Sequence, residues 1–205
     1  MKIDNFFPTP ISQVKLFRNV NKDEIDFIND QRKYVSQNIG NFSSINTYIL
    51  NTPELQEVKE MLTLLVNQYF KTVFDNEPGT ELYITNSWVN WTDNGGYHHI
   101  HKHTNSLVSG VLYIQTSQDD EIDFINPNKF LGNINIKPIQ TTLWNKEHWS
   151  YNANENNVIL FPSTLEHGVN QRPHTCYGTR ISLSFNTWVK GRVGDARACN
   201  ELIIE

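Results

Sequence analysis

The sequence is poor in cysteine and has no long apolar run near its start. Only two of its 205 residues are cysteines, Cys176 and Cys199. Two cysteines do not make a disulfide framework, so we expect a reducing compartment. The first twenty residues are interrupted early by Asn, Asp and Pro. We therefore expect neither a secretory signal nor a membrane span, and we expect a cytoplasmic protein.

Clusters of basic residues are also missing. Lys and Arg number 17 against 22 Asp and Glu, which gives a formal net charge of −5. A general nucleic-acid binder needs a basic face, so this class is excluded, although a single flipped base stays open as a substrate. What is present is 38% apolar and 12% aromatic residues, which indicate a globular chain rich in strands. The length suits one domain, residues 1–205.

Two helices are predicted in the first third of the chain. Asn21–Glu24 has the pattern of a capping box. An apolar stripe at helical spacing follows it: Ile25, Ile28, Val35 and Ile39. For the second helix, Thr52 is the predicted N-cap and Pro53 the first helical residue, and apolar residues then recur every three or four positions from 55 to 73. We expect this helical support, 21–75, to pack against the rest of the chain.

From Glu81 onward the pattern changes to short apolar or alternating runs separated by Gly, Asn, Pro and Asp. We predict strands at 82–91, 107–115, 121–125, 134–136, 141–144, 157–162 and 179–188. Many short strands after two helices indicate an antiparallel sandwich or barrel, with its core at 81–188 and the helices on one outer face.

The strand predicted at 179–188 has two different faces. One face carries polar side chains: Arg180, Ser182, Ser184 and Asn186. The other is apolar and is expected to pack against the helix at 53–74: Ile181, Leu183 and Phe185. A polar interior is costly unless it holds something polar, and a guanidinium there needs an anion. A bound carboxylate and an ordinary salt bridge to an acidic residue are both open for Arg180.

Four of the seven histidines fall within six consecutive positions. Such crowding rarely serves packing, because each imidazole has two ring nitrogens to satisfy. Along an extended strand His99, His101 and His103 share one face, while His98 points the other way. Two histidines spaced H-x-H can grip one ion, and His167 is the best candidate for a third ligand. Iron, copper, nickel or zinc would suit such a site. The alternative is a solvated, His-rich turn without metal.

Several motifs together resemble one family. The run from Phe161 to Val169, "F-P-S…H-x-V", and then Arg180-Ile181-Ser182, "R-x-S", resemble the distal half of the 2-oxoglutarate and Fe(II)-dependent oxygenases. Further segments are similar to a branch of that family found in marine bacteria and their phages: 86–90, 96–98, 101–103 and 109–113. The resemblance covers roughly residues 82–188, about half of the chain.

The resemblance implies a mainly β fold with flanking N-terminal helices, namely a double-stranded β-helix or jelly roll. It implies Fe(II) as cofactor, 2-oxoglutarate as co-substrate and O2 as oxidant. Three histidines take the places of the metal ligands: His101, His103 and His167. Arg180 takes the place of the arginine that binds the remote carboxylate of 2-oxoglutarate, and Ser182 and Tyr113 take places beside it. The implied reaction is hydroxylation of a second substrate, a small molecule or a side chain that the sequence does not name.

The sequence departs from the wider family in its ligand set. The family uses H-x-D or H-x-E, whereas this chain has His101-Lys102-His103, and the nearest upstream acid, Asp93, has the wrong spacing. A second histidine leaves the ion more positive than a carboxylate would. This favours a dianionic co-substrate and weakens metal retention near the imidazole pKa of about 6.5. His99 is a rival for either ligand position.

Two other functions stay open. A cupin-like metal-binding protein without turnover is favoured by the all-histidine ligand set. A three-histidine dioxygenase without 2-oxoglutarate leaves Arg180 and Ser182 without a role. Metal-dependent consumption of 2-oxoglutarate separates the leading hypothesis from both.

The two ends of the chain are predicted from their apolar residues. Residues 1–20 suggest a short strand and a connector lying against the body. The last apolar residues, Leu202, Ile203 and Ile204, suit either a homodimer contact or a tail docked on its own domain.

Overall fold

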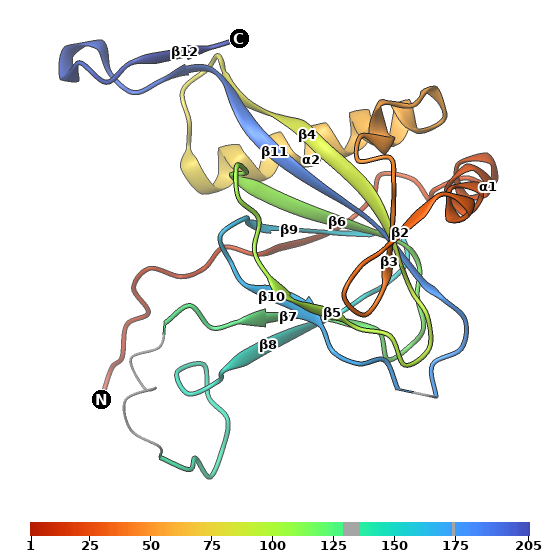
Figure 1. Ribbon diagram of the computed structural model, residues 1–205. Coiled ribbons are helices and arrows are strands. Elements are labelled where there is room, and N and C mark those ends of the chain that lie inside the picture. The colour runs from red at the N-terminus through yellow and green to blue at the C-terminus, as the bar shows by residue number, and fades with distance from the viewer. Residues whose placement is uncertain (129–135, 174) are drawn as a thin grey trace.

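The computed structural model describes residues 1–128, 136–173 and 175–205, and most of its regular structure is β-strand (Figure 1). The larger sheet has the strand order β1-β9-β6-β11-β4-β3-β2, with β12 paired to β11. Its strands are β1 (Ser12–Lys15), β2 (Val35–Gln37), β3 (Phe42–Ser44), β4 (Thr80–Thr92), β6 (Val108–Gln115), β9 (Asn157–Pro162), β11 (Arg180–Val193) and β12 (Leu202–Ile204).

The smaller sheet has the order β5-β10-β7-β8. Its strands are β5 (His98–His101), β7 (Glu121–Ile125), β8 (His148–Asn152) and β10 (His167–Val169). Neighbouring strands in both sheets are antiparallel. Four strands of the larger sheet, β9-β6-β11-β4, lie across from the four of the smaller one, which is the predicted jelly roll.

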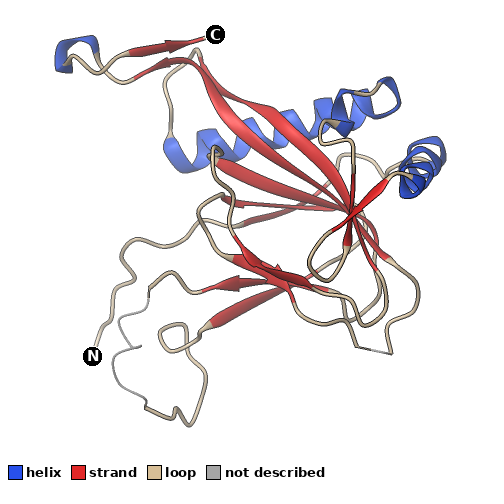
Figure 2. Ribbon diagram, viewed as in Figure 1, coloured by secondary structure: helices blue, strands red, loops and turns tan. Residues whose placement is uncertain are grey.

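The helices cover the outer face of the larger sheet (Figure 2). α1 spans Lys22–Asp30 and α2 spans Gln56–Phe74. Leu183 and Phe185 of β11 are fully buried in one core cluster with Leu62 and Val66 of α2. The prediction that the apolar face of this strand packs against the second helix is confirmed. The opposite face of β11 therefore points between the two sheets.

The predicted capping box of the first helix is confirmed, but the predicted length is wrong. The Asn21 side chain accepts from the Glu24 N–H, and the Glu24 carboxylate accepts from the Asn21 N–H. The helix ends at Asp30, and Val35 starts strand β2 instead. Val35 and Ile39 continue the helical spacing of apolar residues, but they are not helical. The pairing of β2 with β3 overrides the helical pattern in this segment.

The start of the second helix also differs from the prediction. Thr52 makes no side-chain cap, because its hydroxyl donates to the Ile49 carbonyl. Pro53 begins a short 3-10 turn, and α2 starts at Gln56. The apolar stripe is confirmed as the buried face from Leu55 to Tyr69, whereas Val73 at its end is exposed.

Most predicted strands are confirmed. β7 and β9 have nearly or fully the predicted bounds, while β4, β6 and β11 lie where strands were predicted but differ in length. The strand predicted at 141–144 is wrong, because Thr142 and Asn145 close a turn through side-chain hydrogen bonds. Most of the strand predicted at 134–136 lies outside the described residues. Five strands of the structure were not predicted: β2, β3, β8, β10 and β12.

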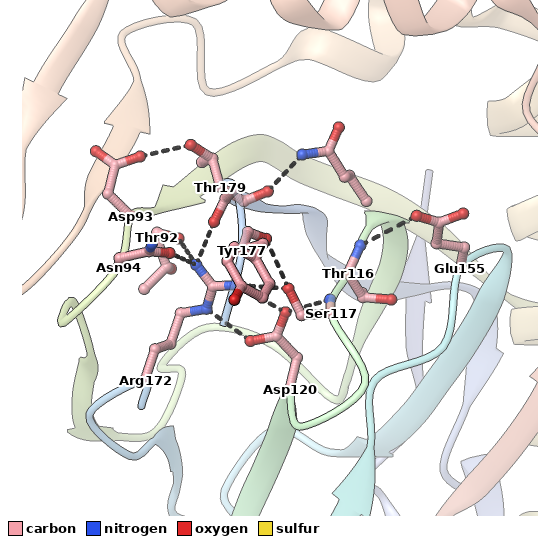
Figure 3. A network of polar contacts seen from close by, with 12 residues as sticks. Thr92, Asp93, Asn94, Thr116, Ser117, Asp120, Glu155, Arg172, Tyr177 and Thr179 are labelled. Atoms are coloured by element: carbon pink, nitrogen blue, oxygen red, sulfur yellow. Dashed lines mark hydrogen bonds and ion pairs between the residues drawn. The ribbon is translucent and has the colours of Figure 1, made fainter. Parts of the chain in front are cut away.

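A buried ion pair ties three loops together at one end of the sandwich (Figure 3). Arg172, between β10 and β11, donates from Nε and Nη2 to the two carboxylate oxygens of Asp120, at 2.6 and 3.0 Å. Its Nη1 donates to the carbonyls of Thr92 and Gly178, each at 2.8 Å. The end of β4, the β6–β7 loop and the β10–β11 loop are thus joined through one guanidinium, which the sequence did not point to.

One strand near each end of the chain pairs with a strand of the larger sheet. The predicted N-terminal strand is confirmed as β1, which pairs with β9. Strand β12 pairs with the end of β11, on an arm that projects from the body (Figure 1). Leu202 and Ile203 on this arm are exposed. Both cysteines are free thiols. No helix in the described part of the chain is long and apolar enough to cross a membrane.

Candidate metal centre

A polar pocket lies between the two sheets. The larger sheet contributes Asn90 from β4 and Arg180, Ser182 and Ser184 from β11. The side of the smaller sheet contributes four histidines: His98 and His101 from β5, His167 from β10, and His103 just beyond β5. The apolar part of the wall includes Val111, Ile122 and Phe161. The polar face of β11 thus faces the side of the smaller sheet that carries the histidines.

Three of the predicted site residues converge in this pocket. The ligand nitrogens of His101, His103 and His167 lie within 4.8 Å of one another, and we call these residues the inner triad. His101 and His167 pair directly across the β5–β10 ladder. His103 lies beyond the end of β5, where its backbone N–H donates to the Ser163 carbonyl at 2.9 Å. Residues 66 positions apart in sequence, 101 and 167, are thereby brought onto one small patch.

The surroundings leave the inner triad ready to bind a cation. Nδ1 of His101 and Nδ1 of His167 donate to the carbonyls of His99 and Leu165, at 2.7 and 2.9 Å. Each ring therefore keeps its lone pair on Nε2. Burial, reinforced by the charge of His101, lowers the pKa of His167 to about 3 and that of His103 to about 4. Neutral imidazoles with fixed tautomers are what a metal ion requires.

A bulge in β5 changes the expected arrangement of the other histidines. His167 pairs with His101 and Val169 pairs with His98, so two steps along β10 correspond to three steps back along β5. The extra residue in β5 brings His98 to the same pocket as His101, so the prediction that His98 points away is wrong. Gly168 permits the bulge, because a Cβ there would lie 2.9 Å from the His98 carbonyl oxygen.

His99 does not join the inner triad. Its ligand nitrogen groups with those of His98 and His101 instead. We expected His99, His101 and His103 to share one face of a regular strand. The bulge breaks this regularity, and the strand ends at His101, before His103. The pattern H-x-H still marked the two inner histidines, because they flank the end of the strand.

Two of the residues predicted to bind the remote carboxylate, Arg180 and Ser182, line the same pocket, and the third, Tyr113, lies beside Arg180. Arg180 and Ser182 are 3% and 2% exposed, and Tyr113 is fully buried. The guanidinium carbon of Arg180 lies 5.2 Å from the centre of the Tyr113 ring. Nε of Arg180 and the hydroxyl of Tyr113 are buried without a hydrogen-bond partner among the described residues. Burial raises the pKa of Tyr113, so this phenol keeps its proton as a donor.

No carboxylate in the described part of the chain forms an ion pair with Arg180. Of the two partners open for it, the ordinary salt bridge is therefore absent from these residues. A buried guanidinium and a buried phenol, both with unused donors, fit an anion that enters the pocket. The donor sets match a metal ion at one end and a carboxylate at the other.

Sequence reasoning gave no role to Asn90, which lines the pocket, or to the buried Ser109 and Ser163. Asn90 donates to the Ser184 hydroxyl at 3.0 Å, and its Oδ1 is buried without a partner in the described structure. Ser109 bridges Ser163 and Asn186, at 2.8 Å each. These groups come from four different strands or their ends, so only the pairing of strands reveals that they meet.

The comparison with protein families agrees with this chemistry. Residues 86–186 match the family model described as "Putative 2OG-Fe(II) oxygenase". That range holds the inner triad, Arg180 and Ser182. Among curated proteins, no sequence matches the chain.

Several solved structures share the fold of this chain. An oxidoreductase of the 2OG-Fe(II) oxygenase family from Burkholderia pseudomallei has a TM-score of 0.56 at 13% identity, with 86% of this chain and 83% of that chain covered. HygX from Streptomyces hygroscopicus, with nickel, 2-oxoglutarate and hygromycin B bound, has 0.54 at 11%, covering 87% and 82%. A Pseudomonas putida prolyl-4-hydroxylase has 0.55 at 12%, covering 88% and 94%.

Identities this low show the fold alone, and the family is carried by the sequence match together with the site. The further resemblance to a marine bacterial and phage branch stays a prediction. The chain belongs to the 2-oxoglutarate and Fe(II)-dependent oxygenases, and it is a dioxygenase that uses Fe(II) and 2-oxoglutarate.

Proposed function

We propose that the protein hydroxylates a C–H bond of a small molecule or of a side chain, with His101, His103 and His167 as the metal ligands. Arg180 then binds the remote carboxylate of 2-oxoglutarate. The observation that carries this proposal is the pairing, in one pocket, of a three-histidine group with a buried guanidinium that has no carboxylate partner in the described residues. The proposal treats residues 1–205 as one domain, with 21–75 supporting 81–188.

The roles of the residues follow from their donors. The fork of Arg180 matches a carboxylate in two parallel hydrogen bonds, and the hydroxyls of Ser182 and Tyr113 add single donors. The apolar wall of Val111, Ile122 and Phe161 excludes water beside them. The co-substrate is thereby held in one orientation, with its keto-acid end toward the inner triad.

When bound, Fe(II) with O2 and 2-oxoglutarate supplies the oxidation: one oxygen atom goes to the substrate as hydroxyl, and the other to succinate, with release of CO2. The protein's part is to hold the ligands neutral, to orient the co-substrate and to keep the pocket dry. The second substrate must approach from the side of the pocket left open by these groups.

The similar structures illustrate two kinds of substrate. HygX was captured with hygromycin B, a small molecule, and the P. putida protein is a prolyl-4-hydroxylase. Mass spectrometry of whatever co-purifies with the protein is the direct way to decide between a small molecule and a side chain here.

The test is a titration of the anaerobic Fe(II) protein with 2-oxoglutarate, followed by the metal-to-ligand absorption band. We expect a band in the parent and markedly weaker binding in Arg180→Lys, because lysine keeps the charge but loses the fork. Arg192→Lys, on the exposed end of the same strand, is the matched control. No band in the parent would leave a metal-binding protein without turnover. A band with unchanged affinity in Arg180→Lys would move the carboxylate site elsewhere.

A further inference from the structure

A second triangle of histidines shares one corner with the inner triad. We propose that His98, His99 and His101, which we call the outer triad, form a second site for a divalent transition-metal ion, and that this site competes with the inner triad. Their ligand nitrogens all lie within 4.8 Å of one another. The inference rests on the proposed function only in taking His101 as an inner ligand.

The two triangles have almost the same size. In the inner triad the ring centroids are 4.4 Å apart for His101 and His167, and 5.1 Å apart for the two pairs with His103. In the outer triad the corresponding distances are 4.4, 5.1 and 5.3 Å. The two triangles therefore have closely similar ring spacings, and in both of them the ligand nitrogens lie within 4.8 Å of one another. The bulge in β5 produces the outer triangle, since regular alternation would separate His98 from His101.

The outer histidines have nitrogens free to bind. Nδ1 of His99 is buried and has no hydrogen-bond partner among the described residues. Nε2 of His98 lies 3.3 Å from the Asn38 amide nitrogen, which can only donate, so that ring nitrogen carries a lone pair. A contact of this length is weak, and a metal ion replaces it at low cost. None of the outer triad is fully buried, whereas His167 is, so the outer site is the more accessible one.

The two sites exclude each other through His101. Its Nδ1 donates to the His99 carbonyl at 2.7 Å, which leaves Nε2 as its one lone pair. One lone pair binds one ion, so an ion in the outer triad withdraws His101 from the inner triad. Because Ni²⁺, Cu²⁺ and Zn²⁺ bind nitrogen ligands more tightly than Fe²⁺, these ions are the ones expected to occupy the outer site and to inhibit the enzyme.

The experiment isolates the outer site by removing the inner one. Metal-free His103→Ala/His167→Ala protein is titrated with ZnCl2 at neutral pH by calorimetry, after circular dichroism has shown that it folds. We expect one Zn²⁺ per chain. Adding His99→Ala should weaken this binding by at least about tenfold, because even loss of a group that only supports a ligand costs about 10–100-fold. Adding His148→Ala, an exposed histidine on β8, is the matched control and should change nothing.

Three results would overturn the proposal: no zinc binding by the double variant, unchanged affinity after His99→Ala, or two zinc ions bound by the parent, which would show that His101 is not shared. If the double variant does not fold, His103→Gln/His167→Gln keeps side-chain size and serves in its place. These outcomes need no 2-oxoglutarate. Zinc binding as expected, combined with no absorption band in the Fe(II) protein, would therefore sink the proposed function and leave the outer site standing.

Discussion

Two arginines only eight positions apart in sequence, Arg172 and Arg180, are buried to the same degree and have opposite surroundings. Each is 3% exposed. Arg172 is enclosed by protein acceptors, with Asp120 bound through two nitrogens and two backbone carbonyls on a third. Arg180 makes no ion pair within the described residues, and its Nε has no partner there. The first guanidinium is thus satisfied by the protein, and we propose that the second binds the carboxylate of a ligand.

The comparison separates a buried charge that has partners inside the protein from one that has none among the described residues. Burying a charge is costly, and an internal partner recovers that cost in the folded state. Arg172 recovers it in every folded molecule, and in return joins three loops. In the role that we propose, Arg180 recovers this cost when an anion enters the pocket, and the cost is then part of the binding energy. The exposed fraction does not distinguish the two residues. The number of guanidinium N–H groups with a protein acceptor does distinguish them.

The largest expected effect comes from placing an unpaired charge on the other face of the strand that holds Arg180. Leu183→Asp should abolish folding, with a loss of more than about 4 kcal/mol, because residue 183 is fully buried against α2 with no polar partner. Ser184→Asp, which faces the pocket, is the control and should stay folded. The measurement is the soluble yield and urea unfolding of both variants. A soluble Leu183→Asp protein of parental stability would refute the assignment of the two faces.

The next effect tests the enclosed arginine. Asp120→Ala leaves Arg172 buried without its carboxylate, and we expect a loss of about 3–5 kcal/mol in the free energy of unfolding. Asp119→Ala, exposed and adjacent, should change it by less than about 0.5 kcal/mol. Chemical unfolding of the metal-free proteins gives both values. A small loss in Asp120→Ala would mean that water replaces the carboxylate and that the network does not hold the loops.

The sequence could not have distinguished the two arginines by itself. The alternation of polar and apolar residues around Arg180 revealed a polar face, because this pattern involves only neighbouring positions of one strand. The pairing of Arg172 with Asp120 joins positions 52 residues apart, and no local pattern signals it. The helices and most of the longer strands were predictable for the same local reason. The helix predicted beyond Asp30 failed because a strand pair formed there instead.

The site shows the same limit. The spacing of His101 and His103 and the resemblance predicted which residues converge. The bulge that turns His98 into the pocket depends on how close Gly168 approaches β5, and this contact exists only once β10 has paired. Likewise, a strand was predicted at 141–144, but hydrogen bonds of the Thr142 and Asn145 side chains to the backbone form a turn there.

The third prediction concerns removal of the Arg180 guanidinium. Arg180→Met should leave the ligand-free protein as stable as the parent, within about 1 kcal/mol, because no ion pair in the described structure is lost. A ligand at 100 times its dissociation constant stabilises a folded protein by about 2.7 kcal/mol, and 2-oxoglutarate should confer this on the Fe(II) parent but not on the variant. Thermal unfolding with and without the co-substrate measures both quantities. A variant destabilised like Asp120→Ala would show that Arg180 is structural too.

The smallest effect concerns the hydroxyl beside Arg180. Tyr113→Phe deletes a buried donor that has no partner in the described structure, so stability should not fall, whereas 2-oxoglutarate should lose one hydrogen bond, worth about 0.5–1.5 kcal/mol. The matched control is Tyr69→Phe, because the Tyr69 hydroxyl donates to the Pro10 carbonyl at 2.9 Å. That variant should lose about 1 kcal/mol of stability and bind 2-oxoglutarate as the parent does. The two variants should behave oppositely because the Tyr69 hydroxyl has its acceptor within the chain, whereas the acceptor proposed for the Tyr113 hydroxyl belongs to a ligand. If Tyr113→Phe binds the co-substrate normally, the carboxylate does not reach Tyr113, and Arg180 and Ser182 bind it alone.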